Sequence, residues 1–538
     1  MRKGLMLTSP RGIGRAALVS LAVSAAVLCT STIGVRAADR PLVIARDMDI
    51  NSLDPHRSWC DTCQIFDTSV YEHLTTLDKD NKLVPLLAAS WISNKDQTEF
   101  TFKLDPAAKF SDGSAVEAKD VKWSFERLKN LKQSSSYLTD TIEQIDTPDA
   151  RTVVIKLNIP NSEFPQIVAA PTMAILNSDL VAEHGGLADA TAADKDGAEQ
   201  WLMTNSAGSG PFILEKYEPN AELRLKRNDN YWGTKAPAPE VVFRQVKDAV
   251  AQAQMLQSGT VDVAMQIDPD TAKTLEGTDV KVERVASFNF VYVAIAPGAK
   301  ANKVKLSPEV REAISLAIDR KGLIDVTLGG AGRELGAPIP LGFPGGEGQE
   351  IPAYDPAKAK ELLAKAGLAD GFTLDSTYPA MNVYGVDLNL MMQKVQQDLS
   401  KVGIKVELSP VPFANWREKV NGDHTGLTAV FFAPDFFGTS QYVDYFGLGE
   451  TSVWAKRAGA DNDPSIRNAK IDDVRKAALA APTPEEATKK WFEAGQMMAK
   501  DRIILPMVSP DLILAYGSSV KGVRYSACCN LPLSEISY

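Results

Sequence analysis

Apolar residues recur along this chain with two periods, one of about two residues and one helical. Short apolar runs, alternating or continuous, predict strands at LVIARDMD (42–49), TEFTFKL (98–104), TVVIKL (152–157), AELRLKR (221–227), VDVAMQI (261–267), FNFVYVAIA (288–296) and LTAVFF (427–432). The predicted strands and helices are intermixed over the whole length. This mixture indicates an α/β protein.

Helical signals concentrate in the later part of the chain. Ser307-Pro308 has the form of an N-cap followed by proline in the first turn, and it predicts a helix through VREAISLAIDRKGLIDVTLGG (310–330). Asp355-Pro356 opens AKAKELLAKAGL in the same way, and Thr483-Pro484-Glu485-Glu486 has capping-box spacing ahead of a helix at 487–499. A further helix has one apolar face, which we interpret as core: Leu388, Met391, Met392, Val395 and Leu399.

Glycine-rich segments predict loops at 185–199, 205–211 (NSAGSGP) and 336–352. The chain has 538 residues, which exceeds what one compact core organises, so two to three domains are expected.

The first 37 residues have the order of a secretory signal peptide. Arg2, Lys3, Arg11 and Arg15 precede an apolar run at 17–29, and small residues follow, which places cleavage after Ala37. Lipidation at Cys29 is the alternative, but Leu28 stands where a small residue is normally found. The run is too short for a permanent membrane span, so we expect a soluble, exported protein in the periplasm.

Charge narrows the range of partners. The net charge of the whole chain is −10, and removal of residues 1–37 takes away five basic groups and no acid, which leaves about −15. A chain this acidic is poorly suited to binding nucleic acid or anionic lipid.

The common motifs of catalysis are missing from the sequence. There is no GxxxxGK[ST] phosphate loop and no GxSxG nucleophile elbow. His56, His73, His184 and His424 are scattered and form no HxxxH pair, so no metal site is expected. We expect no cofactor and no catalytic residue, and a secreted hydrolase using carboxylates is kept as the alternative from another class.

Four cysteines follow the leader, as a CxxC pair (Cys60, Cys63) and an adjacent pair (Cys528, Cys529). Export favours disulfides. A four-thiolate zinc site and free or redox thiols are the alternatives, although adjacent cysteines rarely converge on one ion. The connectivity stays open, and a bond between the two pairs would tie the N-terminal region to the C-terminal end.

From Asn51 to His56 (NSLDPH) the chain resembles the periplasmic solute-binding proteins of ABC importers in the oligopeptide, dipeptide and nickel class. The resemblance continues through VYEHLTTLDKDNKLVPLLAASW, TEFTFKLDPAAKFSDGSAVEAKDVKWSFERL, GSGPFILEKYEPNAELRLKRNDNYWG (208–233), MLQSGTVDVAM (255–265), VREAISLAIDRKGLI (310–324), YDPAKAKELLAKAG (354–367) and LPMVSP (505–510). It covers essentially the whole chain after the leader, in the order of the family.

The resemblance implies a two-lobed periplasmic-binding-protein fold of type II, in the large class with an extra domain and a hinge. Domain I would then be discontinuous, with domain II and domain III inserted between its parts. The implied bounds are 38–76, 205–298 and 505–538 for domain I, 77–204 for domain II and 299–504 for domain III.

The implied function is binding without chemistry. A monomer would enclose a peptide or peptide-like cationic ligand between its lobes and dock on a membrane permease served by separate ATPase subunits. Within the class, the alternatives are a non-peptide solute, such as an opine, a sugar or chelated nickel. A sensor that docks on a chemoreceptor would use the same closure without transport.

Candidate ligand contacts come from matched positions. In peptide-binding relatives, residues shortly after LDPH lend backbone groups to an extended peptide, and Trp59, Cys60 and Asp61 occupy that place here. A surface loop pinned by a disulfide is the structural alternative.

A second matched segment follows the strand at 427–432. Asp435 stands where relatives carry an aspartate that pairs with the ligand's α-ammonium group, and Phe432 is the aromatic residue before it. A solvated loop aspartate is the alternative. Trp416 matches a pocket tryptophan, with a core role as the alternative, and Arg417 could meet a carboxylate or simply be exposed. Many relatives have an Asp-Pro pair just downstream, whereas this chain has Gly438-Thr439.

Overall fold

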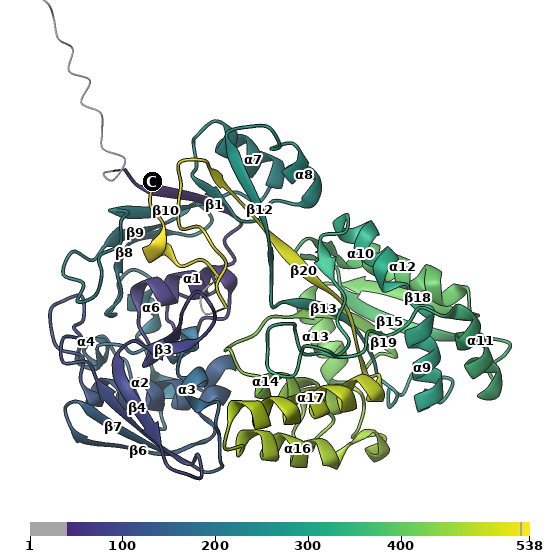
Figure 1. The fold of residues 1–538 in the computed structure, drawn as a ribbon. Helices are drawn as coiled ribbons and strands as arrows, with labels where there is room; N and C mark the ends of the chain where they lie inside the picture. The colour runs from purple at the N-terminus through teal and green to yellow at the C-terminus, as the bar shows by residue number, and fades with distance from the viewer. Residues whose placement is uncertain (1–39, 528–529) are drawn as a thin grey trace, which may run out of the picture. The chain divides into compact units, whose positions relative to one another are not determined.

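The computed structural model describes residues 40–527 and 530–538. Within them, the largest of the sheets is a mixed sheet of 12 strands (Figure 1). Its strands, in order across the sheet, are β18 (Ile404–Val411), β15 (Phe372–Pro379), β19 (Leu427–Phe432), β13 (Phe290–Ile295), β20 (Ile504–Gly517), β11 (Val263–Ala264), β1 (Leu42–Arg46), β10 (Glu240–Gln245), β9 (Glu222–Arg227) and β8 (Phe212–Glu218), with β12 (Val280–Ala286) and β14 (Gly332–Arg333) also paired to β20.

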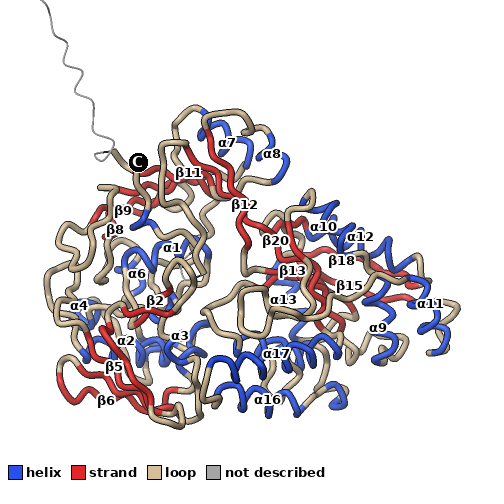
Figure 2. Tube along the Cα trace, in the orientation of Figure 1, coloured by secondary structure: helices blue, strands red, loops and turns tan. Residues whose placement is uncertain are grey.

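The long strand β20 joins the two halves of this sheet. Its first part pairs antiparallel with β13, and its last part pairs with β12 and β11. Figure 2 shows β20 continuing from the strands around β13 to those around β12. Parallel pairs, such as β1 with β10 and β15 with β18, flank this antiparallel centre.

A separate antiparallel sheet lies between residues 88 and 157, with the strand order β4 (Ala88–Ser93), β5 (Glu99–Leu104), β7 (Thr152–Leu157) and β6 (Ile142–Asp149). Helix α2 (Ala118–Leu131) packs its apolar face on this sheet, because Val121, Phe125 and Leu128 share one core with Phe100 and Phe102. Two small hairpins complete the strands: β2 (Thr75–Leu77) with β3 (Leu83–Pro85), and β16 (Asn382–Val383) with β17 (Val386–Asp387).

The remaining helices follow the chain in this order: α1 (Asp61–Val70), α3 (Phe164–Ile167), α4 (Ser178–Glu183), α5 (Ala192–Lys195), α6 (Glu199–Leu202), α7 (Ala249–Gln257), α8 (Pro269–Lys273), α9 (Pro308–Ala317), α10 (Arg320–Leu328), α11 (Pro356–Lys365), α12 (Leu388–Ser400), α13 (Phe413–Asn421), α14 (Ser440–Phe446), α15 (Val453–Arg457), α16 (Ala469–Leu479) and α17 (Pro484–Asp501). Short 3₁₀ turns are η2 (Ser134–Thr139), η3 (Pro171–Met173), η4 (Pro464–Ile466) and η5 (Leu533–Glu535).

The predicted strands are confirmed, although the run at 261–267 forms only the two-residue strand β11. The helix predicted through 310–330 is wrong in one respect, because it divides into α9 and α10. Ile318 leaves the helical region, and Asp319 begins the second helix by accepting a hydrogen bond from the Gly322 N–H at 2.9 Å.

The core interpretation of the apolar helix face is confirmed by α12, whose predicted apolar residues are all fully buried. The capping signal before α17 is also confirmed, since Thr483 accepts from the Glu486 N–H at 3.3 Å. The segments 205–211 and 336–352 contain no helix or strand, whereas α5 and part of α6 lie in the predicted loop at 185–199.

Among the described residues, no helix is both long enough and apolar enough to cross a membrane. The predicted signal peptide and Cys29 lie outside the described residues. The division into three domains stays a prediction.

Candidate ligand-binding site

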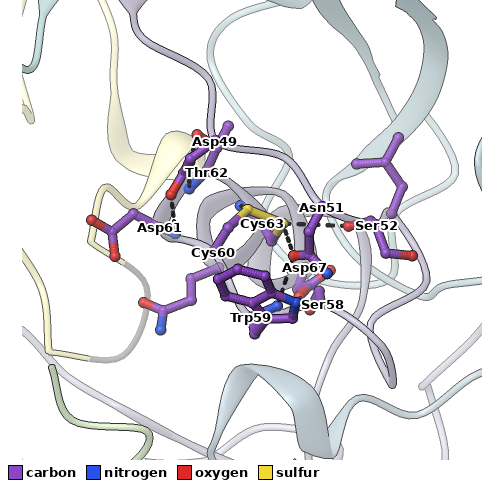
Figure 3. Close-up of a disulfide and its surroundings, with 12 residues drawn as sticks. Asp49, Asn51, Ser52, Ser58, Trp59, Cys60, Asp61, Thr62, Cys63 and Asp67 are labelled. Atoms are coloured by element: carbon purple, nitrogen blue, oxygen red, sulfur yellow. Dashed lines mark hydrogen bonds between the residues drawn. A yellow bond between two sulfur atoms is a disulfide. The ribbon is translucent and has the colours of Figure 1, made fainter. Parts of the chain in front are cut away.

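A disulfide between Cys60 and Cys63 fixes the first turn of α1 (Figure 3). Cys60 is the N-cap residue, and its Sγ accepts a hydrogen bond from the Cys63 N–H at 2.9 Å. The disulfide prediction is therefore confirmed for this pair. Neither cysteine is left to bond Cys528 or Cys529, which lie outside the described residues.

Asp49 holds the same turn from outside the helix. Its carboxylate accepts from the N–H groups of Asp61 and Thr62, both at 3.0 Å, and from the Thr62 hydroxyl at 2.5 Å. Burial alone would raise the pKa of Asp49, but the nearby Arg46 and these hydrogen bonds outweigh it and lower the pKa. Asp49 therefore stays ionised and caps α1.

The segment before Thr62 is thus a helix start and not a free loop. The Trp59 N–H donates to Asn51 Oδ1 at 3.0 Å, and the N–H groups of Asp61 and Thr62 donate to Asp49. These three backbone donors are used inside the protein. The side chains of this segment remain candidates for ligand contact.

Two of these side chains point away from the disulfide, Trp59 and Asp61 (Figure 3). The Trp59 side chain is 68% exposed, which is unusual for so large an apolar group. The Asp61 carboxylate has no hydrogen-bond donor or ion-pair partner within the described residues. Enclosure by surrounding protein, and then the negative charge of Asp49, raise the pKa of Asp61 to about 6. Cys60, by contrast, is only 5% exposed.

Asp435 lies on the loop between β19 and α14. Tyr137, from η2 in a distant part of the sequence, donates its hydroxyl to Asp435 Oδ2 at 2.6 Å. The Asp435 N–H donates to Gln441 Oε1 at 2.8 Å, which fixes the loop. The Asp435 side chain is solvent-exposed, yet protein surrounds it closely enough that desolvation raises its pKa. A side chain that is both reachable and enclosed is suited to pairing with a cation from solution.

Phe432 is half-buried at the end of β19 and packs in an aromatic cluster. Its ring centroid lies 4.9 Å from that of Tyr445, 5.0 Å from Phe446 and 5.4 Å from Tyr442. The cluster gives a rigid base to the loop that carries Asp435. A ligand contact of Phe432 itself stays a prediction.

Trp416 lies in α13 and is 2% exposed. Its Nε1 donates to Thr428 Oγ1 at 2.8 Å, so its polar edge is satisfied inside the protein. These contacts are those of a core residue, and a ligand contact for Trp416 stays a prediction. Arg417, the next residue, is exposed.

The charges of both candidate segments affect the pKa of Tyr384. Tyr384 lies at the tip of the β16–β17 hairpin with a φ of 52°, a left-handed conformation that is uncommon for an aromatic residue. Burial, followed by the charges of Asp61, Asp49 and Asp435, raises the pKa of Tyr384.

Sequence reasoning missed Asp49 and Tyr137 as neighbours of the predicted residues. Asp49 is the last residue of the predicted strand at 42–49. That position, at the end of a strand, was the one available sign that its side chain could act on a neighbouring segment. No local pattern indicated Tyr137, because its proximity to Asp435 depends on a long-range contact.

Asp54 and His56 of the LDPH motif belong to a buried network of charged and polar side chains around Arg127. Arg127, from α2, makes a two-pronged contact with Asp54, at 2.9 Å and 2.6 Å, and also bonds Asp196 at 2.8 Å. His56 Nε2 lies 3.1 Å from the Ala174 carbonyl oxygen, and its Nδ1 lies 3.2 Å from Arg127. Burial, together with Arg127, lowers the pKa of His56 to about 4. His56 is thus a neutral structural residue in this network.

Among the described residues, no group of three or more His, Cys, Asp or Glu side chains is arranged to hold a metal ion. Surface hollows of about 490 and 540 Å³ lie beside β4 and α3 and beside α12 and β18. Neither is lined by a candidate residue, so they do not bear on the predicted site.

Comparison with known proteins gives consistent relatives. Residues 82–452 match the model of bacterial extracellular solute-binding proteins, family 5 middle. The probable D,D-dipeptide-binding periplasmic protein DdpA of Escherichia coli (strain K12) is 27% identical over 494 residues, which cover 90% of this chain and 91% of that protein.

Comparison with solved structures shows that the fold is similar as well. The ABC transporter-associated periplasmic binding protein DppA from Helicobacter pylori, in complex with peptide STSA, matches with a TM-score of 0.76 at 20% identity, covering 93% of this chain and 98% of that one. The periplasmic binding protein AgaA from A. tumefaciens R10, in complex with agropinic acid, matches with a TM-score of 0.73 at 24% identity over 93% and 98%. The predicted two-lobed α/β fold is confirmed. With a family model matched over most of its length, the chain belongs to family 5 of the bacterial extracellular solute-binding proteins.

Proposed function

We propose that this protein captures a peptide or peptide-like solute with a free ammonium group between its two lobes and delivers it to the permease of an ABC importer. Separate ATPase subunits supply the energy, and the protein itself performs no chemistry. It acts as a monomer in the periplasm after its signal peptide is cleaved, with lobes that follow the three predicted domains.

The names of the relatives support this ligand class. DdpA is described as D,D-dipeptide-binding, and DppA was solved with a bound peptide. Ligand closes such proteins because some contacts form only when both lobes meet.

The observation that carries the proposal is the carboxylate of Asp435. It is reachable from solution and enclosed by protein, and among the described residues its one hydrogen bond is from the neutral hydroxyl of Tyr137. An ammonium group placed there gains a charge-assisted hydrogen bond in partly desolvated surroundings, whereas an uncharged end group does not.

Calorimetry with Asp435→Asn tests the proposal. We expect this variant to weaken a di- to tetrapeptide with a free amino terminus by about 2–5 kcal/mol, because it removes the charge that the ammonium group meets. The same peptide with an acetylated amino terminus should bind weakly to both proteins. Tyr137→Phe is the matched control, since it removes only the neutral donor and should cost less than the loss of the carboxylate.

The pH dependence follows from the raised pKa of Asp435. Affinity for the cation is complete while Asp435 is ionised and falls as acidification protonates it. Equal affinity of Asp435→Asn and the native protein for the free-amino peptide would remove Asp435 from the site.

An opine is the second candidate ligand, because AgaA was solved with agropinic acid. Binding of agropinic acid in preference to every peptide would replace the peptide assignment while leaving the transport role intact.

A further inference from the structure

Glu163 joins two regions that are far apart in the sequence. It precedes α3, but its side chain does not cap that helix. Instead, its Oε1 accepts the Thr439 N–H at 2.9 Å, and its Oε2 accepts the Ser440 N–H at 3.0 Å. Glu163 is 7% exposed and has no ion-pair partner within the described residues. A carboxylate buried without a cation is costly, and these hydrogen bonds offset part of that cost.

Residues 435–440 form the loop that leads into α14 and carries Asp435. Gln441 closes this loop on itself, because its side chain accepts the Asp435 N–H and donates to the Phe436 carbonyl oxygen. Phe436 is 5% exposed, and among the described residues every other buried member of its hydrophobic core comes from positions 74–175. The 435–440 loop is therefore a fixed unit that packs into a distant region of the chain.

The pair Gly438-Thr439, where this chain departs from the Asp-Pro of many relatives, allows the contact with Glu163. A Cβ atom at Gly438 would lie 2.7 Å from Glu163 Oε2, so a side chain there would displace the carboxylate. A proline at position 439 would have no N–H to donate to Glu163. The departure in sequence and the contact are therefore explained together.

These contacts cross the predicted boundary between domain II (77–204) and domain III (299–504). A backbone hydrogen bond crosses it as well, since the Ser162 N–H, next to Glu163, donates to the Leu479 carbonyl oxygen at 2.8 Å. Contacts between two domains form only when the domains meet. They therefore favour the closed state that encloses a ligand.

We propose that Glu163 is a positioning residue for ligand binding. Its carboxylate fixes the 435–440 loop where domains II and III meet, with Asp435 placed for the ammonium group of the ligand. Glu163 is itself buried and acts through the loop. This inference rests on the proposed function and deepens it, because it assigns the placement of Asp435 to a residue of the other domain.

The test is calorimetry with tetra-alanine, with either a free or an acetylated amino terminus. The ratio of the two affinities measures how well Asp435 meets the ammonium group. Glu163→Gln has one acceptor oxygen for two N–H groups, so we expect this ratio to fall about tenfold, as for the loss of one charge-assisted hydrogen bond. A structural role alone would lower the melting temperature and leave the ratio unchanged. Glu143→Gln removes an exposed carboxylate of β6 and is the control for net charge.

Thr439→Pro tests the same contact from the other side, because it deletes the N–H and leaves every charge in place. The φ of Thr439, −83°, is compatible with proline. Thr439→Val is the matched variant, since it keeps the N–H and removes only the hydroxyl that donates to the Pro344 carbonyl oxygen at 2.8 Å. Thr439→Pro should lower the ratio as Glu163→Gln does, and Thr439→Val should lower it less.

Two sets of results separate this inference from the proposed function. If acetylation weakens binding to the native protein, a native ratio in Thr439→Pro or in folded Glu163→Gln would overturn the role of Glu163 alone, as would an equal fall in Thr439→Val and Thr439→Pro. The Thr439 variants decide the question if Glu163→Gln does not fold. A native protein that binds both peptides equally, or neither of them, would overturn the proposed function and this inference with it.

Discussion

Asp49 and Asp61 lie at the start of the same helix, but the protein stabilises only one of the two charges. Asp49 accepts three hydrogen bonds, and these and Arg46 lower its pKa. Asp61 accepts none, and its pKa rises to about 6. A carboxylate that is kept without partners in the folded state reduces stability, and such positions are often retained for function.

This difference predicts the effect of Asp61→Asn on stability. The folded-state pKa of about 6 exceeds the ordinary value of 3.8, so the folded protein binds more protons than the unfolded chain between about pH 4 and 6. Stability is therefore lost as the pH rises through that window. At pH 7, Asp61→Asn should raise the free energy of unfolding by about 1–2 kcal/mol, because partial exposure screens part of the roughly 3 kcal/mol that the full pKa shift represents.

Denaturant unfolding at pH 7 and near pH 4 measures this effect. The gain from Asp61→Asn should shrink at the lower pH, where the native Asp61 is protonated. Asp49→Asn is the matched control, and it should lower stability at pH 7. A loss of stability in Asp61→Asn at pH 7 would contradict the account.

At the scale of elements, the start of α1 is fixed both by the segment before it and by its own first turn. The Arg127 network fixes residues 54–57 ahead of it, and the Cys60–Cys63 disulfide closes its first turn. Trp59 and Asp61 lie in the sequence on either side of Cys60, between the fixed residues 54–57 and Cys63. We infer that the disulfide holds their side chains in place for a ligand.

The double variant Cys60→Ser with Cys63→Ser tests the role of this disulfide. The closed loop is short, so its loss should cost about 2 kcal/mol of stability and leave the fold intact. Ligand affinity should fall as well, because Trp59 and Asp61 lose their fixed positions. Circular dichroism would confirm the fold, and calorimetry would measure the affinity; unchanged affinity in a folded variant would limit the disulfide to a structural role.

Elements with strong local signals could be predicted from the sequence. The buried face of α12 and the cap of α17 follow from spacing and capping residues alone. Helix α1 was missed because its N-cap residue is a cysteine, and the carboxylate that accepts from its first N–H groups belongs to Asp49, 12 residues before Asp61. The break between α9 and α10 was missed because Asp319 was read as part of one continuous helical pattern.

At the scale of the whole molecule, the candidate site is assembled from segments far apart in the chain. Tyr137 and Asp435 are separated by 298 positions, and their hydrogen bond joins η2 to the loop after β19. Family resemblance could place Asp61 and Asp435 in a ligand site. It could not supply Tyr137, because the hydrogen bond from Tyr137 to Asp435 depends on how distant segments pack.

The most direct measurement is native mass spectrometry of the protein purified without denaturation from the cell that makes it. Proteins that enclose a ligand between two lobes bury most of it, so part of the cellular ligand should be retained. The account predicts a series of adduct masses that correspond to intact peptides with a free amino group. A single uncharged solute, or peptides found only as cleaved products of those supplied, would contradict it.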